Sequence, residues 1–240
     1  MSIKAMVLAA GRGERMRPLT DVTPKPLLEV HGKPLMQWAI EALAAGGFTE
    51  LVVNTAWLGE QVPNRLRHDF PDISYSHEGR DFGGALETAG GIARALPSLG
   101  DVFWVVAGDV FAPDFMFTRA AVERFAASGL LAHLWLVPNP PHNPNGDFGL
   151  DRDGFATNAA VGPAASRYTF STIALYSAAL FALPNSKIPP GNPGGIKLAL
   201  APLLRAAIEH RRVSAQIYTG PWSDVGTPER LAALNAAAPE

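Results

Sequence analysis

The chain has 240 residues, of which 48% are hydrophobic and 18% are charged, a composition typical of a folded protein that buries its own core. Its formal net charge of −2 gives no global electrostatic reason to bind nucleic acid or an anionic membrane, so any phosphate site must be local. The absence of cysteine excludes disulfides, thiolate catalysis and cysteine-ligated metals.

The first strand candidate covers residues 3–10, and its apolar run at residues 6–10 leads directly into Gly11-Arg12-Gly13. It is too short for the apolar part of a signal peptide or for a membrane span. We therefore expect a buried strand here, in a soluble cytoplasmic protein with no membrane or nucleic-acid partner.

Short β-rich runs then alternate with longer segments of helical periodicity, which is typical of an α/β fold with a mainly parallel sheet. The next strands are expected at residues 50–55, 72–77, 102–110 and 130–137. Helices are expected at residues 34–47, 58–67, 86–96 (opening with Thr88) and 114–127. The face of the first helix that we expect to be buried holds Leu35, Trp38, Ala39 and Ala42.

The alternation stops at residues 138–146, where four prolines and three asparagines exclude regular structure. Residues 147–157 predict a hairpin that turns at Asp153-Gly154, and residues 166–177 predict a longer strand. The remaining elements are a helix at 197–210, a strand at 213–219, a turn at 221–227 and a final helix that Thr227 caps. We expect one domain, residues 1–240, with a βα half at 1–137 and a smaller half at 138–240.

Residues 8–30, LAAGRGERMRPLTDVTPKPLLEV, concentrate glycine and positive charge directly after the first strand. Gly11 and Gly13 allow a tight turn that presents N–H groups to an anion, and guanidinium groups suit phosphate. The basic side chains of the turn are Arg12, Arg15 and Arg17. Met16 stands where a dinucleotide fingerprint needs glycine, and no Gly-Lys-Ser/Thr of a Walker A loop follows. A plain basic surface loop remains the alternative.

Three further residues are candidates for phosphate chemistry. Lys25 lies between two prolines that restrict its backbone, which suits a side chain that must reach one phosphate oxygen. Asp109 and Asp224 each follow a strand, at the sheet edge where α/β proteins bind ligands, and could together hold Mg²⁺. Each of the three could instead be an ordinary turn residue.

The histidines and tryptophans favour structural roles. The six histidines lack ligand spacing, and we expect His133 to be a packed or surface residue. Packing is also expected of Trp38, Trp57, Trp104 and Trp135. No Gly-X-Ser-X-Gly elbow supports a hydrolase.

Residues 8–30 closely resemble the signature of the sugar-phosphate nucleotidyltransferases, in which Gly-X-Gly-(Thr/Ser/Glu)-Arg-(Leu/Met)-X-Pro-Leu-Thr precedes Pro-Lys-Pro. LETAGG (86–91), AGD (107–109) and WSDVGT (222–227) follow in the order of that family, so the resemblance extends from Ile3 to about Arg230. It implies a Rossmann-like three-layer α/β/α nucleotidyltransferase fold with a mixed, mainly parallel central sheet. It also implies a Mg²⁺-dependent enzyme that joins a nucleoside triphosphate to a sugar 1-phosphate and releases pyrophosphate.

The resemblance assigns roles to residues at matching positions. Catalytic roles fall to Arg15, Lys25, Asp109 and Asp224, and the last two would ligate Mg²⁺. The nucleotide, bound by the 1–137 half, would contact Leu8, Ala9, Ala10, Gly11, Gly13, Glu14, Arg15, Lys25, Glu78 and Gly108. The sugar phosphate, bound mainly by the 138–240 half, would contact Glu87, Thr88, Gly90, Asp147, Gly149, Ser171 and Lys197.

The substrate pair is indicated by three further segments. NTAWLGEQV (54–62), GDFGL (146–150) and TFSTIALY (169–176) most resemble the branch that transfers UMP to N-acetylmuramate 1-phosphate in peptidoglycan recycling. Two features depart from that branch: Ala107 replaces a common asparagine, and the loop at 79–87 is longer. The alternatives are a guanylyltransferase for mannose 1-phosphate or another hexose 1-phosphate, a regulatory subunit that binds a nucleotide sugar, and, least favoured, a dehydrogenase. We expect a monomer or a small homo-oligomer.

Overall fold

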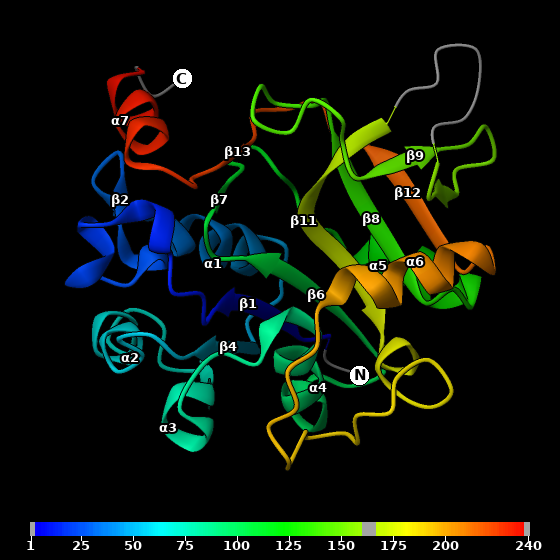
Figure 1. Ribbon diagram of the computed structural model, residues 1–240, viewed down its shortest axis with the longest axis horizontal. Coiled ribbons are helices and arrows are strands. Elements are labelled where there is room, and N and C mark those ends of the chain that lie inside the picture. Colours follow the sequence, from blue (N-terminus) through cyan, green and yellow to red (C-terminus); the bar gives the residue numbers. More distant parts are fainter. Residues whose placement is uncertain (1–2, 160–166, 238–240) are drawn as a thin grey trace.

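The computed structural model describes residues 3–159 and 167–237, and within them the main sheet has nine strands. Four of them are parallel neighbours in the order β6-β1-β4-β5, of which Figure 1 labels β6, β1 and β4. They are β1 (Ala5–Ala9), β4 (Leu51–Thr55), β5 (Ser74–His77) and β6 (Val102–Ala107). The apolar runs of β1, β4 and β6 are buried on both faces, as the composition of β6 predicts.

The second part of the sheet is built on β11 (Arg167–Ser177), which runs antiparallel to β6 on one side and to β8 (Ala132–Val137) on the other. β12 (Val213–Ile217) lies parallel to β8 at the far edge. The other end of β11 pairs with β9 (Phe148–Leu150) of the predicted hairpin, whose second strand is β10 (Ala156–Thr157). The sheet is therefore mixed and mainly parallel, as expected.

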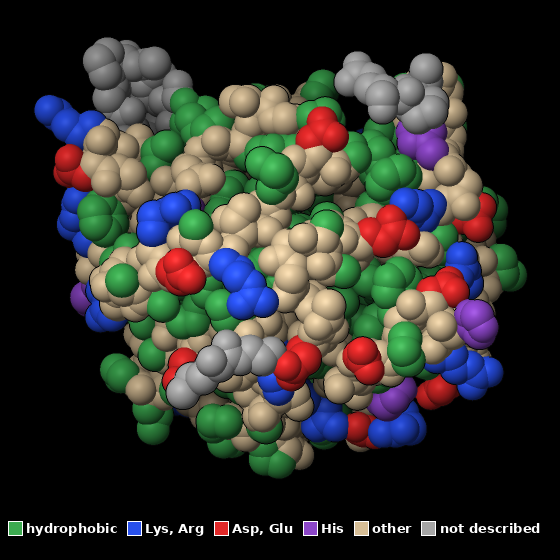
Figure 2. Space-filling model, turned by 180° about the vertical axis from the view of Figure 1, so that it is seen from behind, with side chains coloured by type: hydrophobic (Ala, Val, Ile, Leu, Met, Phe, Trp, Pro, Cys, Tyr) green, Lys and Arg blue, Asp and Glu red, His purple; other side chains and the backbone are tan. Residues whose placement is uncertain are grey.

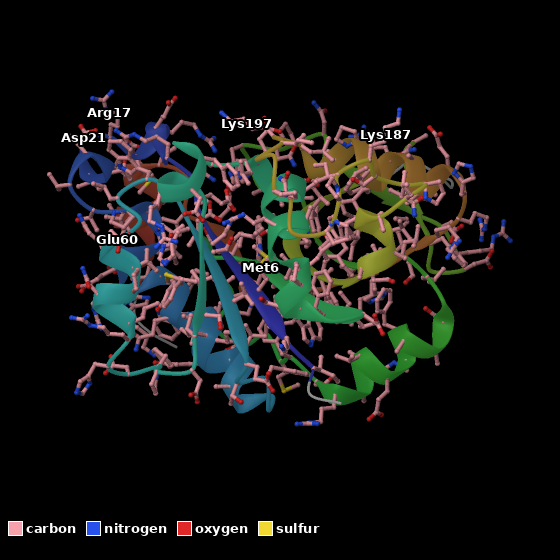
Figure 3. The ribbon with its side chains drawn as sticks, turned by 90° about the horizontal axis from the view of Figure 1, so that it is seen from below. Met6, Arg17, Asp21, Glu60, Lys187 and Lys197 are labelled. Carbon is pink, nitrogen blue, oxygen red and sulfur yellow. The ribbon has the colours of Figure 1, made fainter. Side chains whose placement is uncertain are left out.

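Helices cover both faces of the sheet, because side chains alternate along each strand. In β1, Val7 packs in one core with α1 (Leu35–Ala45), α2 (Gln61–Leu66) and α5 (Arg119–Ser128). Met6, at the centre of the molecule in Figure 3, packs in the opposite core with α4 (Glu87–Leu99) and α6 (Leu200–Glu209). The three-layer α/β/α arrangement is thereby confirmed.

The final helix, α7 (Pro228–Ala236), packs on the N-terminal loops instead of on the sheet. A third cluster joins Leu231 of α7 and Val225 to Met16, Val30 and Leu35. Thr227 caps α7 as predicted, because its hydroxyl accepts a hydrogen bond from the N–H of Arg230 at 3.4 Å. The C-terminal stretch is thus held against residues 14–35.

Several short elements have no counterpart in the prediction. Two-residue strands form the ladders β2 (Glu29–Val30) with β3 (Lys33–Pro34) and β7 (Val110–Phe111) with β13 (Ser223–Asp224). Short 3-10 helices cover Glu14–Met16, Leu19–Asp21, Lys25–Leu27 and Ala178–Phe181. A helix, α3 (Glu78–Phe82), occupies part of the segment expected to be a loop.

Helix boundaries differ from the prediction where capping or packing decides them. The helix expected at 114–127 begins at Arg119, because Phe115 and Phe117 enter the core from a segment without regular structure and Thr118 caps the helix. The helix expected at 58–67 shortens to α2, since Leu58 has a positive φ of 48°. α4 begins at Glu87 instead of Thr88, and the helix expected at 197–210 begins at Leu200.

The buried face of α1 also differs from the prediction. Its buried residues are Leu35, Met36, Ala39, Ile40 and Leu43. Trp38 and Ala42 lie at the half-buried edges of that face, and Trp38 packs edge-on against Phe111. Residue 166, where the strand at 166–177 was expected to begin, lies outside the described residues.

The molecular surface carries acidic and basic side chains interspersed on the face seen in Figure 2, in keeping with the near-neutral net charge. Within the described ranges, no helix combines the length and apolar character that a bilayer crossing needs.

Candidate functional site

A cavity of about 680 Å³ opens at the carboxyl ends of β1, β4 and β6 and continues toward β9, β11 and α6. It therefore lies between the two halves of the chain, at the sheet edge where ligands were expected. The predicted site residues that line it are Leu8, Ala9, Ala10, Gly11, Lys25, Glu78, Glu87, Thr88, Asp109 and Asp147. The other described lining residues include Asn54, Ala107, Phe148, Phe170, Thr172, Tyr176, Leu200, Leu204 and Arg205.

The turn after β1 is braced by its own arginine. Arg12 donates to the carbonyl of Thr20 at 2.9 Å and to the carboxylate of Asp21 at 2.8 Å, and its guanidinium lies 3.8 Å from the centre of the Trp57 ring. Arg17 also pairs with Asp21, and Figure 3 shows the two side by side. The charges of Arg12 and Arg17 are thus both paired with Asp21 inside the loop.

Arg15 differs from both neighbours, because it is exposed and makes no ion pair within the part of the chain that the structure describes. With Glu14 it forms the 3-10 helix that begins after Gly13, whose φ of 65° is a backbone conformation that favours glycine. Gly13, Glu14 and Arg15 are not among the described residues of the cavity wall. Of the loop arginines, Arg15 is the one available to an incoming triphosphate.

Lys25 and Asp109 meet at the cavity wall. Lys25 Nζ contacts the carboxylate of Asp109, and the lysine side chain is 12% exposed. Pro24 is extended and directs the chain into the 3-10 helix that carries Lys25. Gly108 donates its N–H to the carbonyl of Leu8 at 2.8 Å, and a Cβ there would lie 2.9 Å from that oxygen. Glycine therefore lets the end of β6 approach β1 and brings Asp109 beside the phosphate-loop candidate.

Asp224 reaches the same region through the ladder of β7 and β13. Asp224 pairs in register with Val110, and the N–H of Val225 donates to the carbonyl of Asp109 at 2.9 Å. The Asp224 carboxylate contacts His142 at 2.7 Å and Arg230 at 2.6 Å. Neither residue was singled out in the sequence analysis; His142 precedes Asp224 by 82 positions, so its contact has no local signal in the chain.

The two aspartates fit a Mg²⁺ site in their chemistry, since Mg²⁺ in proteins commonly takes one or two carboxylates and completes its shell with water and phosphate oxygens. Within the described residues, no group of three or more His, Cys, Asp or Glu side chains is placed to hold a metal ion. Water and phosphate oxygens would have to supply the remaining ligands. The donor set is thus suited to a metal that arrives with a phosphate substrate.

Glu78 is fully buried and is held by two donors. Asn54 Nδ2 donates to one carboxylate oxygen and the N–H of Leu86 donates to the other, each at 2.7 Å. Asn54 Oδ1 in turn accepts the N–H of Ala9 at 2.8 Å. Burial raises the pKa of Glu78, although the hydrogen bonds from Leu86 and Asn54 and the charge of Arg94 oppose that rise. This network fixes the backbone of the cavity wall at Ala9.

Two non-glycine residues of the wall have positive φ angles, Glu87 at 59° and Thr172 at 61°. Such strain is found preferentially at functional sites. Asp147 is held nearby, because its carboxylate accepts the N–H of Phe170 at 2.8 Å. The part of the wall where the sugar phosphate was expected is therefore built from strained or tightly held groups.

Four predicted sugar contacts lie outside the described wall, as does Gly108, in addition to the three nucleotide contacts of the loop named above. Ser171 is buried and donates to the carbonyl of Trp135 at 2.6 Å, while its neighbours Phe170 and Thr172 line the cavity. A Cβ on Gly90 would lie 2.5 Å from the carbonyl of Ile196, so that glycine serves helix packing. Gly108, as described above, also serves close packing, and Gly149 packs against Thr157 in the β9–β10 hairpin. Lys197 is exposed at the periphery (Figure 3).

Comparison with known proteins agrees with this geometry. The model of the nucleotidyl transferase family matches residues 4–240. The chain is 48% identical over 241 residues to the N-acetylmuramate alpha-1-phosphate uridylyltransferase of Neisseria meningitidis serogroup B, with 98% of each chain covered. A protein of the same description from Caulobacter vibrioides is 31% identical, with 97% of this chain and 95% of the relative covered. The fold matches the CTP:phosphocholine cytidylyltransferase of Streptococcus pneumoniae with a TM-score of 0.70, 18% identity and 98% of each chain covered.

Proposed function

This chain belongs to the nucleotidyl transferase family and is a sugar-1-phosphate nucleotidyltransferase, and on that basis we propose that it joins UTP to N-acetylmuramate 1-phosphate. The products are UDP-N-acetylmuramate and pyrophosphate, and the reaction serves peptidoglycan recycling in the cytoplasm. The observation that carries the proposal is the continuous cavity that adjoins both the glycine loop with Lys25 and the wall of Asp147, Phe170 and Thr172.

The nucleotide binds along the turn after β1. Backbone groups from Leu8 to Gly11, which line the cavity, border the base and ribose. Gly13 and Glu14, just outside the described wall, lie beside the triphosphate. Arg15, which has no ion-pair partner in the described chain, closes on the triphosphate, while Arg12 keeps the turn rigid through Asp21 and Trp57. Rigid positioning of this kind removes much of the entropic cost of the reaction.

The chemistry is an in-line displacement at phosphorus. An oxygen of the sugar 1-phosphate attacks the α-phosphorus of UTP, and the bond from that phosphorus to the bridging oxygen of pyrophosphate breaks. Lys25, held at the wall by Asp109, neutralises charge on the phosphates as the transition state forms. No protein nucleophile is required.

Asp109 and Asp224 would hold Mg²⁺, which when bound supplies further positive charge to the phosphates. The two carboxylates are carried on paired strands or directly beside them, so the second half of the chain contributes to the same cluster as the first. Turnover should therefore be lost in a chelator and restored by added Mg²⁺.

The decisive experiment is a matrix of four nucleoside triphosphates against a panel of sugar 1-phosphates, scored by pyrophosphate release. We expect the highest kcat/KM for UTP with N-acetylmuramate 1-phosphate. Turnover of GTP with mannose 1-phosphate, without activity on the first pair, would replace our substrate assignment. Absence of pyrophosphate release with every pair would favour a regulatory subunit.

A further inference from the structure

The two cationic side chains of the described cavity wall differ in whether a carboxylate pairs with them. Among the described lining residues the two cationic side chains are Lys25 and Arg205. Lys25 is paired with Asp109, whereas Arg205 makes no ion pair within the described residues. An arginine on a cavity wall without a carboxylate partner is available to an anion of the ligand.

Arg205 is held in place by an aromatic ring. Its guanidinium lies 5.3 Å from the centre of the Phe148 ring, which is carried by β9 on the sugar side of the cavity. The backbone of Arg205 is fixed as well, since it belongs to α6 and its carbonyl accepts Asn158 Nδ2 at 3.0 Å. A guanidinium that stacks on a ring keeps its donor edge available and loses less freedom when it binds.

The surroundings of Arg205 in the wall are apolar. Leu200 and Leu204 come from the same helix, and Phe148 and Phe170 face the cavity from the sheet side. A cation beside apolar side chains suits a short alkyl arm that ends in an anion, because the arm buries its carbon atoms against those side chains while the anion accepts hydrogen bonds from the guanidinium.

We propose that Arg205 recognises a carboxylate on a short alkyl arm of the sugar and thereby selects acidic amino-sugar 1-phosphates over their neutral counterparts. The inference rests on the proposed function, in which the sugar carries a lactyl ether with one methyl group and one carboxylate. The substrate then brings two anions, and the cavity wall offers one cation to each: Lys25 to the phosphate and Arg205 to the carboxylate.

The test compares two substrates that differ in the lactyl group, N-acetylmuramate 1-phosphate and N-acetylglucosamine 1-phosphate, each with UTP. Arg205→Met removes the charge and keeps most of the side-chain length. We expect KM for the acidic substrate to rise about 10- to 100-fold, as for loss of a charge-assisted hydrogen bond, and kcat to change less. KM for the neutral substrate should stay within about twofold, because that substrate makes no use of the charge.

Two further variants make the result specific. Arg205→Lys keeps the charge without the planar fork and should recover part of the selectivity. Arg65→Met makes the same change on α2, on the opposite face of the sheet and outside the described cavity wall, and should leave both substrates unaffected.

The outcomes separate this inference from the proposed function. An equal rise in KM for both substrates would show that Arg205 binds the shared phosphate. Unchanged KM values for both substrates would show that it binds neither group. Either result overturns the inference and leaves the proposed uridylyltransferase activity intact. A wild-type enzyme that prefers the neutral substrate would overturn both.

Discussion

The Glu78→Gln substitution tests whether the buried network behind Ala9 sets the shape of the nucleotide site. The Asn54 amide is oriented by the N–H of Ala9, which it accepts through Oδ1, so its Nδ2 must face Glu78. The N–H of Leu86 faces the other carboxylate oxygen. Glu78 thus meets two donors, and only a side chain with two acceptor atoms satisfies both.

Glutamine has one acceptor and one donor, so the variant must place an N–H group against another donor. Glu78 has no exposed surface, and water therefore cannot replace the lost partner without rearrangement. Leaving one buried donor unsatisfied costs about 1–3 kcal/mol. The neutral amide avoids the penalty for burying a charge, which offsets part of that cost, so we expect a net loss of about 1–2 kcal/mol in the free energy of unfolding.

Urea denaturation of both proteins at pH 7 measures this difference, and steady-state kinetics measure its effect on the site. Because Asn54 positions Ala9, we expect KM for the nucleoside triphosphate to rise about threefold to tenfold. Glu60→Gln is the matched control, since Glu60 is exposed on the surface (Figure 3) and should change stability by less than about 0.5 kcal/mol.

The double variant Asn54→Asp with Glu78→Gln should restore the network. The carboxylate introduced by Asn54→Asp would still accept the N–H of Ala9 and would also accept the glutamine amide, whose carbonyl would then accept the N–H of Leu86. Stability and KM should both return toward the wild-type values. The double-mutant cycle should therefore give a favourable coupling energy between positions 54 and 78. If Glu78→Gln matches the wild type in both measurements, or if the double variant is worse than the sum of the single variants, the network does not act as described.

Three further predictions concern catalysis, pH and capping. Lys25→Ala or Asp109→Ala should each lower kcat about 10²- to 10³-fold with an unchanged circular dichroism spectrum; near-normal turnover would exclude them from the phosphate site. Burial lowers the pKa of His133 from 6.5 to about 4, so the folded protein excludes a proton that the unfolded chain takes up. Stability should be full above pH 6.5 and fall by about 3 kcal/mol as the pH drops to 4, and urea titrations of His133→Gln should lack this part of the pH dependence. Thr227→Ala should cost about 1 kcal/mol in urea denaturation through loss of the α7 cap; no change would show that the 3.4 Å bond contributes nothing.

The sequence predicts the alternating elements because their signals are local. The unbroken apolar run of residues 102–107 is sufficient to indicate a central strand, and two glycines with Lys25 between prolines indicate a phosphate loop. The carboxyl edge of a parallel sheet then predicts where these groups meet. Asp109 and Lys25 are brought together in this way although 84 positions separate them.

What the sequence does not predict depends on partners that are distant in the chain. Nothing near Glu78 indicates that Asn54 and the N–H of Leu86 will enclose its carboxylate. In the sequence, Arg205 is one of the charged residues on an amphipathic helix. Only the fold shows that Phe148 of β9 lies against its guanidinium. Ser171 was assigned a sugar contact by its position in the family resemblance, but it lies outside the described cavity wall. A register shift between Phe170 and Ala174 decides which face of β11 each side chain takes, and the sequence does not show that shift.

The pairing of β13 with β7 has a consequence for how the enzyme is made. Among the described residues, β12 (Val213–Ile217) is the last strand of the main sheet in chain order. Asp224 belongs to the short strand β13 that follows it. Translation on the ribosome therefore delivers the whole sheet, with Asp109 at its edge, before it delivers the second aspartate. The residue that completes the acidic pair leaves the ribosome after the scaffold that receives it.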